Sequence, residues 1–218
     1  MTVDIRKSTN MEEQERIDFQ KQVFQILDTL VNDYKPMIFS ASMTTGDEFQ
    51  IVINIPSKSY EVYMLIQKKF PDKIYAGLGF GDIEIVENRK KPSEMFGTAF
   101  YHARNAIEKA KLKKVDLIFN TGFINFDFEL NTLFQLRSFI NNKWTKRQNI
   151  ILTYIGSSDD ILQKDAAEHF KISEAAISQM KKTSGYELII DVDNLINKLL
   201  LKFEKNYSSE LNVGWLRS

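Results

Sequence analysis

The first long stretch of the chain mixes apolar and polar residues with the period of a helix. Between Glu12 and Asp33, the apolar positions spaced three or four residues apart are Phe19, Val23, Ile26, Leu27 and Leu30. This spacing places them on one face of an amphipathic helix. Lys35-Pro36 follows, and proline cannot continue a helix because it lacks the amide donor. The pattern predicts one helix over residues 12–33.

The next segments have the shorter patterns typical of strands. Residues 37–44 and 48–55 flank Gly46-Asp47, a turn dipeptide, which predicts a hairpin. Two or three residues of strand also precede Asp4. Beyond the hairpin the pattern predicts a helix that opens at Pro56-Ser57 and ends before Pro71, a strand over 74–80, a helix over 93–112 and a strand over 115–119.

The order strand, helix, hairpin, helix, strand, helix, strand is that of a ferredoxin-like, palm-type sheet with one extension. We therefore expect an α+β domain over residues 1–126, with the helices on one face of the sheet. The helix over 93–112 carries small apolar residues at helical spacing, which predicts close packing on the sheet. These residues include Ala99, Ala103, Ala106 and Ala110.

Strand signals fade after Asn125. Residues 128–141 and 146–155 have helical patterns, and the chain stays mainly helical as far as Asn206. We predict an all-α domain over residues 127–218. The boundary lies between Phe126 and Trp144, although no Gly-, Ser- or Pro-rich linker marks it.

The sharpest pattern is a helix-turn-helix over residues 163–182. Ala167 supplies the small residue that two crossing helices need, and Ser173 is a typical N-cap for the second helix. Lys171 stands where glycine is common, because the turn requires a positive φ. Apolar residues close the angle between the helices at Phe170, Ile172, Ile177 and Met180.

In proteins with this motif the second helix lies in the major groove of DNA. The residues expected to face base edges or phosphates are Ser173, Glu174, Ala175, Ser178, Gln179, Lys181 and Lys182. Lys146, Arg147, Lys164 and Lys171 could also reach phosphates. Acidic residues dilute this positive charge, namely Asp159, Asp160, Asp165, Glu168 and Glu174. The alternative is a three-helix unit that serves dimerisation or protein contact.

Composition narrows the class of protein. The formal net charge is zero, which argues against a protein that coats nucleic acid or a membrane by bulk attraction. The chain has no cysteine, so disulfides and thiolate chemistry are excluded. No apolar run approaches the roughly 20 residues of a membrane span, and the start, residues 1–6, has no apolar stretch that could serve as a signal peptide. We expect a cytoplasmic protein without a membrane partner.

Two acidic positions form a candidate metal site. In a ferredoxin-like sheet the first strand lies beside the hairpin strands, so Asp4 and Asp47 could meet at one edge. Paired carboxylates can hold Mg²⁺ against nucleotide phosphates. Gly46-Asp47 also has a simpler interpretation as a good hairpin turn. His102 and His169 have no partner at metal-ligand spacing.

Asp4-Ile5 followed by Gly46-Asp47-Glu48-Phe49 resembles the palm of nucleotidyl cyclases and diguanylate cyclases. That resemblance implies that Asp4 and Asp47 ligate metal and that Glu48 assists. Cationic groups for the triphosphate would be Arg6, Lys7 and Arg104. The short first strand and the small number of such cations argue against catalysis.

The chain more closely resembles the SatD family of bacterial proteins. The resemblance rests on four motifs in order: Asp4-Ile5, the segment 46–50 (GDEFQ), the segment 77–83 (GLGFGDI) and the terminal unit at 163–182. The helix around Arg104 completes the set. The resemblance covers nearly the whole chain and implies a bacterial cytoplasmic protein, without assigning an activity.

Three hypotheses remain open. The first is a DNA-binding regulatory protein whose palm-like domain dimerises or senses a nucleotide, with a homodimer as the expected state. The second is a Mg²⁺-dependent nucleotidyl-transfer enzyme that carries the terminal helices as an accessory. The third is a degenerate palm that acts as a protein-interaction module.

Overall fold

The chain forms two compact units. The computed structural model describes residues 1–6, 12–44, 46–70, 74–85, 90–157, 160–211 and 216–217. The first unit comprises Met1–Asn131 and Asn197–Ser218, and the second comprises Thr132–Ile196. Two long helices, α4 (Ile124–Asn141) and α8 (Tyr186–Leu211), contribute residues to both units.

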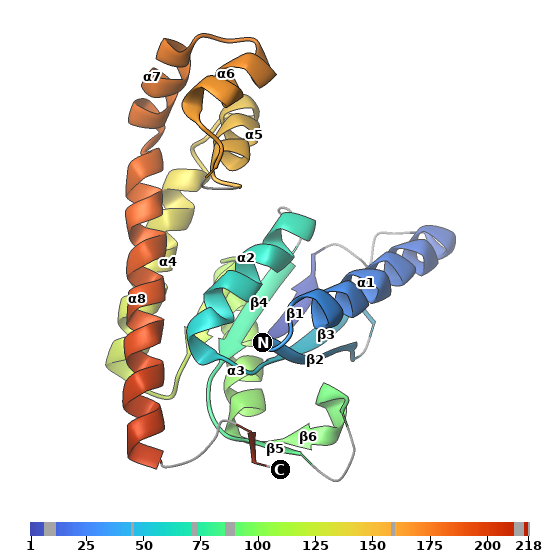
Figure 1. Ribbon diagram of the computed structural model, residues 1–218. Helices are drawn as coiled ribbons and strands as arrows, with labels where there is room; N and C mark the ends of the chain where they lie inside the picture. The colour runs from blue at the N-terminus through green and yellow to red at the C-terminus, as the bar shows by residue number, and fades with distance from the viewer. Residues whose placement is uncertain are drawn as a thin grey trace. The chain divides into compact units, whose positions relative to one another are not determined.

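The first unit is built on a mixed five-stranded sheet (Figure 1), with strand order β2-β3-β1-β4-β7. All neighbouring strands are antiparallel except β4 and β7, which are parallel. The strands are β1 (Thr2–Ile5), β2 (Ile38–Met43), β3 (Glu48–Ile53), β4 (Ile74–Gly79) and β7 (Leu117–Asn120).

The first strand is short but central. β1 pairs with β3 on one side and with β4 on the other, so Asp4 lies opposite both Glu48 and Tyr75. The short strand that the sequence indicated before Asp4 extends through Asp4 to Ile5. Hydrogen bonds to neighbouring strands on both edges hold this four-residue strand in register.

Helices cover both faces of the sheet, which corrects the expectation of helices on one face. Three helices belong to the sheet: α1 (Glu13–Asp33), α2 (Ser59–Lys69) and α3 (Thr98–Lys113). On one face, Phe49 of β3 and Phe19 of α1 both contact the ring of Phe70. On the other face, Ala106 and Ala110 of α3 form a core cluster with Ile118 of β7, and Tyr75 of β4 packs against that cluster. The parallel β4–α3–β7 crossover places α3 on this second face.

The approach of α3 to β4 requires glycine. A Cβ on Gly79 would lie 2.1 Å from the backbone nitrogen of Ala103, and one on Gly77 would lie 2.4 Å from its carbonyl oxygen. Because these obstacles are backbone atoms, no side-chain movement can relieve the clash. The glycines at 77 and 79 thus let helix and strand come into close contact.

Small elements after β4 were not expected from the sequence. β5 (Ile83–Ile85) pairs with β6 (Met95–Phe96) and with β8 (Leu216–Arg217). Residues 92–94 form a short 3₁₀ turn, η3, so α3 begins at Thr98 and not near Ser93. The alanine periodicity that located α3 starts only at Ala99. The other 3₁₀ turn, η2 (Pro56–Lys58), leads into α2.

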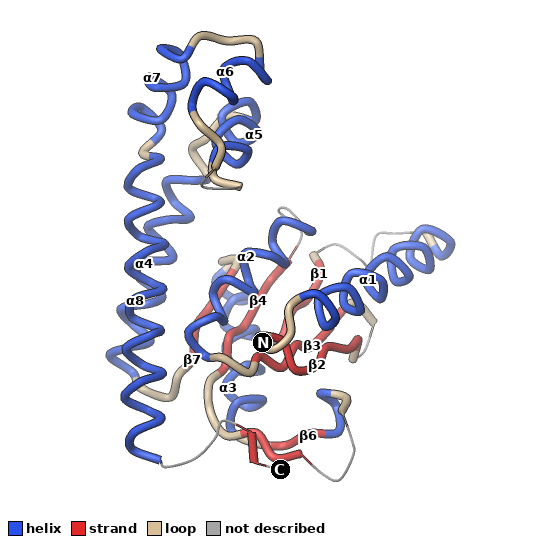
Figure 2. Tube along the Cα trace, viewed as in Figure 1, coloured by secondary structure: helices blue, strands red, loops and turns tan. Residues whose placement is uncertain are grey.

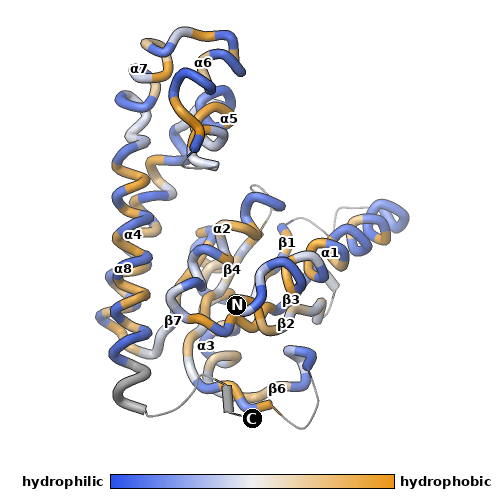
Figure 3. Tube along the Cα trace, in the orientation of Figure 1, coloured by the Kyte–Doolittle hydropathy of each residue, from blue (hydrophilic) through white to orange (hydrophobic). Residues whose placement is uncertain are grey.

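The remainder of the chain is a run of helices (Figure 2). Between α4 and α8 lie α5 (Lys146–Ile155), α6 (Gln163–Phe170) and α7 (Glu174–Ser184). Hydrophilic and hydrophobic positions alternate along α8 (Figure 3), as expected of a helix with one buried face. Within the described part of the chain, no helix is both long enough and apolar enough to cross a membrane.

The second unit has a polar as well as an apolar core. Arg137 of α4 is almost fully buried, and its Nε donates to the carboxylate of Asp193 of α8 at 2.6 Å. The indole of Trp144 stacks on Tyr186 and donates to the carbonyl of Ser184 at 2.8 Å. A buried arginine needs such a partner, because an unpaired charge inside the protein is strongly unfavourable.

Candidate functional site

The pair of helices α6 and α7 forms one small core. Ala166, Ala167 and Ile177 are buried together, with the half-buried rings of Tyr154 and Phe170 packed against them. The alanines let the two helices come close, because a larger side chain at either position would hold them apart. Met180 is half-buried.

The turn between α6 and α7 is closed by local hydrogen bonds. Lys171 has φ +52°, the left-handed conformation that ends α6, and Ile172 N donates to Ala167 O at 3.0 Å. Ser173 Oγ then accepts from Ala176 N at 3.1 Å and caps α7. Lys171 therefore adopts the positive φ that glycine usually supplies, at a cost on the order of 1 kcal/mol.

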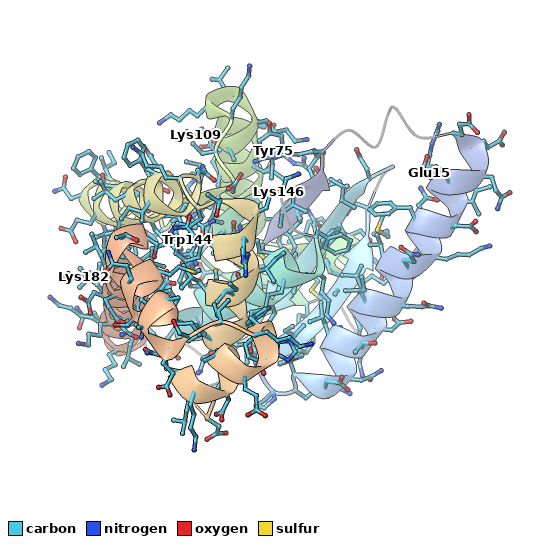
Figure 4. The ribbon with its side chains drawn as sticks, turned by 90° about the horizontal axis from the view of Figure 1, so that it is seen from above. Glu15, Tyr75, Lys109, Trp144, Lys146 and Lys182 are labelled. Carbon is cyan, nitrogen blue, oxygen red and sulfur yellow. The ribbon has the colours of Figure 1, made fainter. Side chains whose placement is uncertain are left out.

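The outward face of α7 is exposed. Six of the residues expected to face a nucleic acid are exposed, namely Ser173, Glu174, Ala175, Ser178, Gln179 and Lys182. Figure 4 shows Lys182 projecting away from its helix. Lys181 differs from the rest, because its Nζ lies 2.7 Å from Glu187 and over the ring of Tyr186. Lys181 is thus engaged within its own unit.

The four other cations expected to reach phosphates lie on α5, on α6 and in the turn before α7. Lys146 and Arg147 open α5, Lys164 lies on α6 and Lys171 in the turn, and all four are exposed. Among the acids that could offset them, the Asp165 carboxylate accepts from Leu162 N at 2.9 Å at the start of α6. Asp160, Glu168 and Glu174 are exposed, and Asp159 lies outside the described residues.

The acidic residues of the sheet lie in a second cluster, which α3 covers. Asp4 Oδ2 accepts from Lys111 Nζ at 2.5 Å. Glu48 forms a bidentate ion pair in which the two terminal guanidinium nitrogens of Arg104 each lie 2.5 Å from one carboxylate oxygen. The Glu48 side chain is 8% exposed and that of Arg104 is 46% exposed. Such bidentate pairs are the strongest ion pairs that arginine forms.

Burial and charge act on Asp4 in opposite directions. Burial raises the pKa of the Asp4 carboxyl, and the hydrogen bond and charge of Lys111 lower it without cancelling the rise. The negative charges of Asp47 and Glu48 raise the pKa of Asp4 further. The hydrogen bonds that Arg104 donates to Glu48 raise the pKa of Arg104. Asp4, Asp47 and Glu48 thus lie close enough to influence one another.

Two of the three carboxylates of the expected Mg²⁺ site, Asp4 and Glu48, form ion pairs with cations of α3. Across the described ranges, no group of three His, Cys, Asp or Glu side chains could hold a metal ion. Asp4 pairs with Lys111, and Glu48 pairs with Arg104. Of the expected phosphate-binding cations, Arg104 pairs with Glu48, Arg6 pairs with Asp116 and stacks on Tyr75, and Lys7 lies outside the described residues.

Sequence reasoning did not identify Lys111 as a partner of Asp4. A signal was present, because Arg104 and Lys111 are seven residues apart on a helix and therefore project from nearly the same side. They flank Ala103 and Ala110, which are buried against the sheet. The alanine periodicity could thus have placed both cations beside the sheet.

Another polar cluster lies where β4 and β7 end. Asp127 accepts from Thr121 N at 2.6 Å and from Thr121 Oγ1 at 2.7 Å, and burial raises the pKa of its carboxyl. Nδ1 of His102 lies 2.5 Å from the carbonyl oxygen of Phe80. His102 is half-buried. These contacts fasten the chain at the carboxyl end of the parallel strand pair.

The fold defines an α+β protein in which a mixed five-stranded sheet is followed by a run of helices. The chain belongs to the SatD family, whose model matches residues 2–200. Comparison with curated proteins and with solved structures gives no match.

Proposed function

We propose that the protein is a bacterial cytoplasmic DNA-binding regulator in which α6 and α7 form a helix-turn-helix and α7 is the recognition helix. The single observation that carries the proposal is the exposed face of α7 opposite its buried Ile177. A recognition helix packs on the protein along one face and leaves the opposite face accessible to the major groove. Short polar side chains such as Ser178 and Gln179 suit base edges, and Lys182 suits a phosphate.

The sheet fits a supporting role in this proposal. The order β2-β3-β1-β4, with α1 and α2 as connections, supports a ferredoxin-like, palm-type sheet that β7 extends. The ion pairs Asp4–Lys111 and Glu48–Arg104 support a structural use of the palm carboxylates. The N-terminal domain would then dimerise or sense a nucleotide, and its carboxylates would not catalyse a reaction.

Retention of the full-length protein on genomic DNA fragments, measured against salt, tests the proposal. The triple variant S178A/Q179A/K182A removes the three groups most suited to contact DNA, while Ile177 and the cap at Ser173 stay intact. We expect at least about a tenfold loss of affinity, and a shallower salt dependence because one phosphate contact is lost.

The control is Lys109→Ala, which removes one exposed cation from α3 (Figure 4). It changes net charge as the triple variant does and should leave retention unaltered. Equal retention of wild type and the triple variant would mean that α7 does not read DNA.

A second candidate function is Mg²⁺-dependent nucleotidyl transfer. The closeness of Asp4, Asp47 and Glu48 favours it, and their pairing with α3 disfavours it. Titration with Mg²⁺ and ATP or GTP should raise the melting temperature if this cluster binds metal and nucleotide. A rise that disappears in Asp47→Ala would support this function, and no rise would favour the DNA-binding proposal or a protein-interaction module.

A further inference from the structure

The first unit contains an apolar groove between the start of α4 and the second half of α8. The cavity measures about 790 Å³. Its floor is the ring of Phe203, which stacks on Phe126 at a centroid distance of 5.4 Å and meets Phe123 edge-on at 6.0 Å. Leu199 adds to the apolar wall. The packed rings hold the groove in shape, so it exists before any ligand arrives.

Large apolar side chains project beside this groove. Ile124 is 85% exposed and Phe128, one helical turn further along α4, is 71% exposed. Together they present on the order of 300 Å² of apolar surface, given the size of large side chains. The largest apolar patch on a typical monomeric protein is about this size, and it often has a function.

Two opposite charges lie on the rim of the same groove. Glu129 of α4 and Lys202 of α8 both line the cavity and both are exposed. Neither forms an ion pair with another residue in the part of the chain that the structure describes. A partner that offers one cation and one anion at these positions would pair with both charges.

We propose that the occupant of this groove is a second copy of the chain, related by a two-fold axis. In such a dimer each contact occurs twice. Glu129 of one copy meets Lys202 of the other, and the reciprocal pair forms at the same time. The surface thus supplies its own charge complement, while Ile124 and Phe128 of each copy fill the groove of its partner.

The apolar area of this surface is large enough for the centre of a dimer interface. A stable interface buries roughly 800 Å² on each partner, and somewhat more than half of that is apolar. Ile124, Phe128 and the half-exposed Phe123 provide on the order of 400 Å² per copy. This surface can therefore form the apolar centre of a standard dimer interface.

The groove would be the interface of the homodimer in the proposed function, and the inference rests on that function to this extent. The dimer need not bind DNA for the inference to hold. Sedimentation of the full-length protein without DNA therefore tests it separately. We expect a dimer whose dissociation constant rises at least about tenfold in Phe128→Ser, a substitution at an exposed site. Phe24→Ser, the same change at a 51% exposed phenylalanine of α1, is the control and should leave the dimer intact.

Charge reversal distinguishes a second copy from any other partner. Glu129→Lys alone places two cations together across the axis and should weaken the dimer, as should Lys202→Glu alone. The double variant E129K/K202E restores opposite charges and should restore the dimer to within about threefold of wild type.

A wild-type chain that stays monomeric up to its solubility limit would overturn the inference, whatever else occupies the groove. A dimer that is insensitive to Phe128→Ser would overturn it as well, as would a double variant that is no better than the two single ones. Circular dichroism of each variant verifies that the helices are unchanged.

Discussion

Asp4 lies in the central strand, where burial and an ion pair act on its carboxyl in opposite directions. Burial is the larger effect, so the pKa of Asp4 is raised despite its contact with Lys111. A raised pKa means that the folded chain binds this proton more tightly than the unfolded chain does. The charged form of Asp4 is therefore tolerated at this position without favouring the fold.

We expect Asp4→Asn to become more stable relative to wild type as pH rises. The contribution of Asp4 to stability is complete below the ordinary aspartate pKa and is lost as pH rises through the raised value. Urea denaturation at steps between about pH 3 and pH 8 measures this difference.

Asp18→Asn provides the control with the opposite sign. Hydrogen bonds from Gln14 and Lys21 lower the pKa of Asp18, so its contribution is present above the ordinary value and is lost as pH falls. The free-energy difference between wild type and variant should therefore slope in opposite directions for the two residues. Equal slopes would contradict the assignment for Asp4.

Removal of Arg104 should destabilise the first unit. Arg104→Ala leaves the Glu48 carboxylate almost buried and without its cation, at a cost of about 2 kcal/mol after allowance for the half-exposed guanidinium. The free energy of unfolding of Arg104→Lys should lie between those of wild type and Arg104→Ala, because a lysine cannot make the bidentate contact. Lys109→Ala, on the exposed side of the same helix, should change the free energy of unfolding by less than about 0.5 kcal/mol.

At the scale of elements, contact between α3 and β4 holds the first unit together. The two elements can approach closely because the strand has glycines and the helix has alanines at the contact. The ion pairs to Asp4 and Glu48 lie beside this contact. α3 therefore both covers one face of the sheet and neutralises that face.

Gly79→Ala should destabilise the first unit by about 3 kcal/mol or more, because the new methyl group overlaps the backbone of α3. Gly46→Ala is the control. A Cβ added at Gly46 would have no atom within 4 Å, so only the strain of φ +63° remains, at about 1–2 kcal/mol. In thermal unfolding, the melting temperature of Gly79→Ala should lie well below that of Gly46→Ala. The reverse order would show that α3 can move away from the strand.

The cap at Ser173 supports α7 alone. Ser173→Ala should lower the local stability of α7 by about 1 kcal/mol, because Ala176 N loses its acceptor. Ser178→Ala makes the same chemical change on the exposed face and should have little effect. Hydrogen exchange of the α7 amides distinguishes the two variants, and equal protection in both would contradict a capping role.

At the scale of the whole molecule, zero net charge limits how strongly a single copy can bind DNA. Exposed cations near α7 are offset by exposed acids on the same helices. A dimer would improve this balance, because two linked recognition helices bind far more tightly than either alone.

Phe128→Ser should therefore weaken DNA retention at low protein concentration, even though Phe128 lies outside α7. At concentrations that restore the dimer, retention should recover toward wild type, whereas S178A/Q179A/K182A should stay defective at every concentration. Titration of both variants on the same DNA fragments checks this. A loss in Phe128→Ser that does not depend on concentration would contradict a link through dimerisation.

The sequence alone determined those features that depend on neighbouring residues. The helix expected over 12–33 is confirmed as Glu13–Asp33, and the helix expected over 146–155 is confirmed as Lys146–Ile155. The family was recognisable because its motifs are short, local and in a fixed order. Helical periodicity, turn residues and caps act over a few positions, and these are visible in the chain itself.

Only the tertiary structure decided what meets across long separations. Asp4 and Lys111 are 107 residues apart, and Glu48 and Arg104 are 56 apart. Their pairing depends on strand register and on which face α3 covers, and a different face would have left both carboxylates without these cations. The pattern of apolar residues predicts that a helix packs on the sheet. The handedness of the parallel crossover and the backbone space above Gly77 and Gly79 determine where it packs.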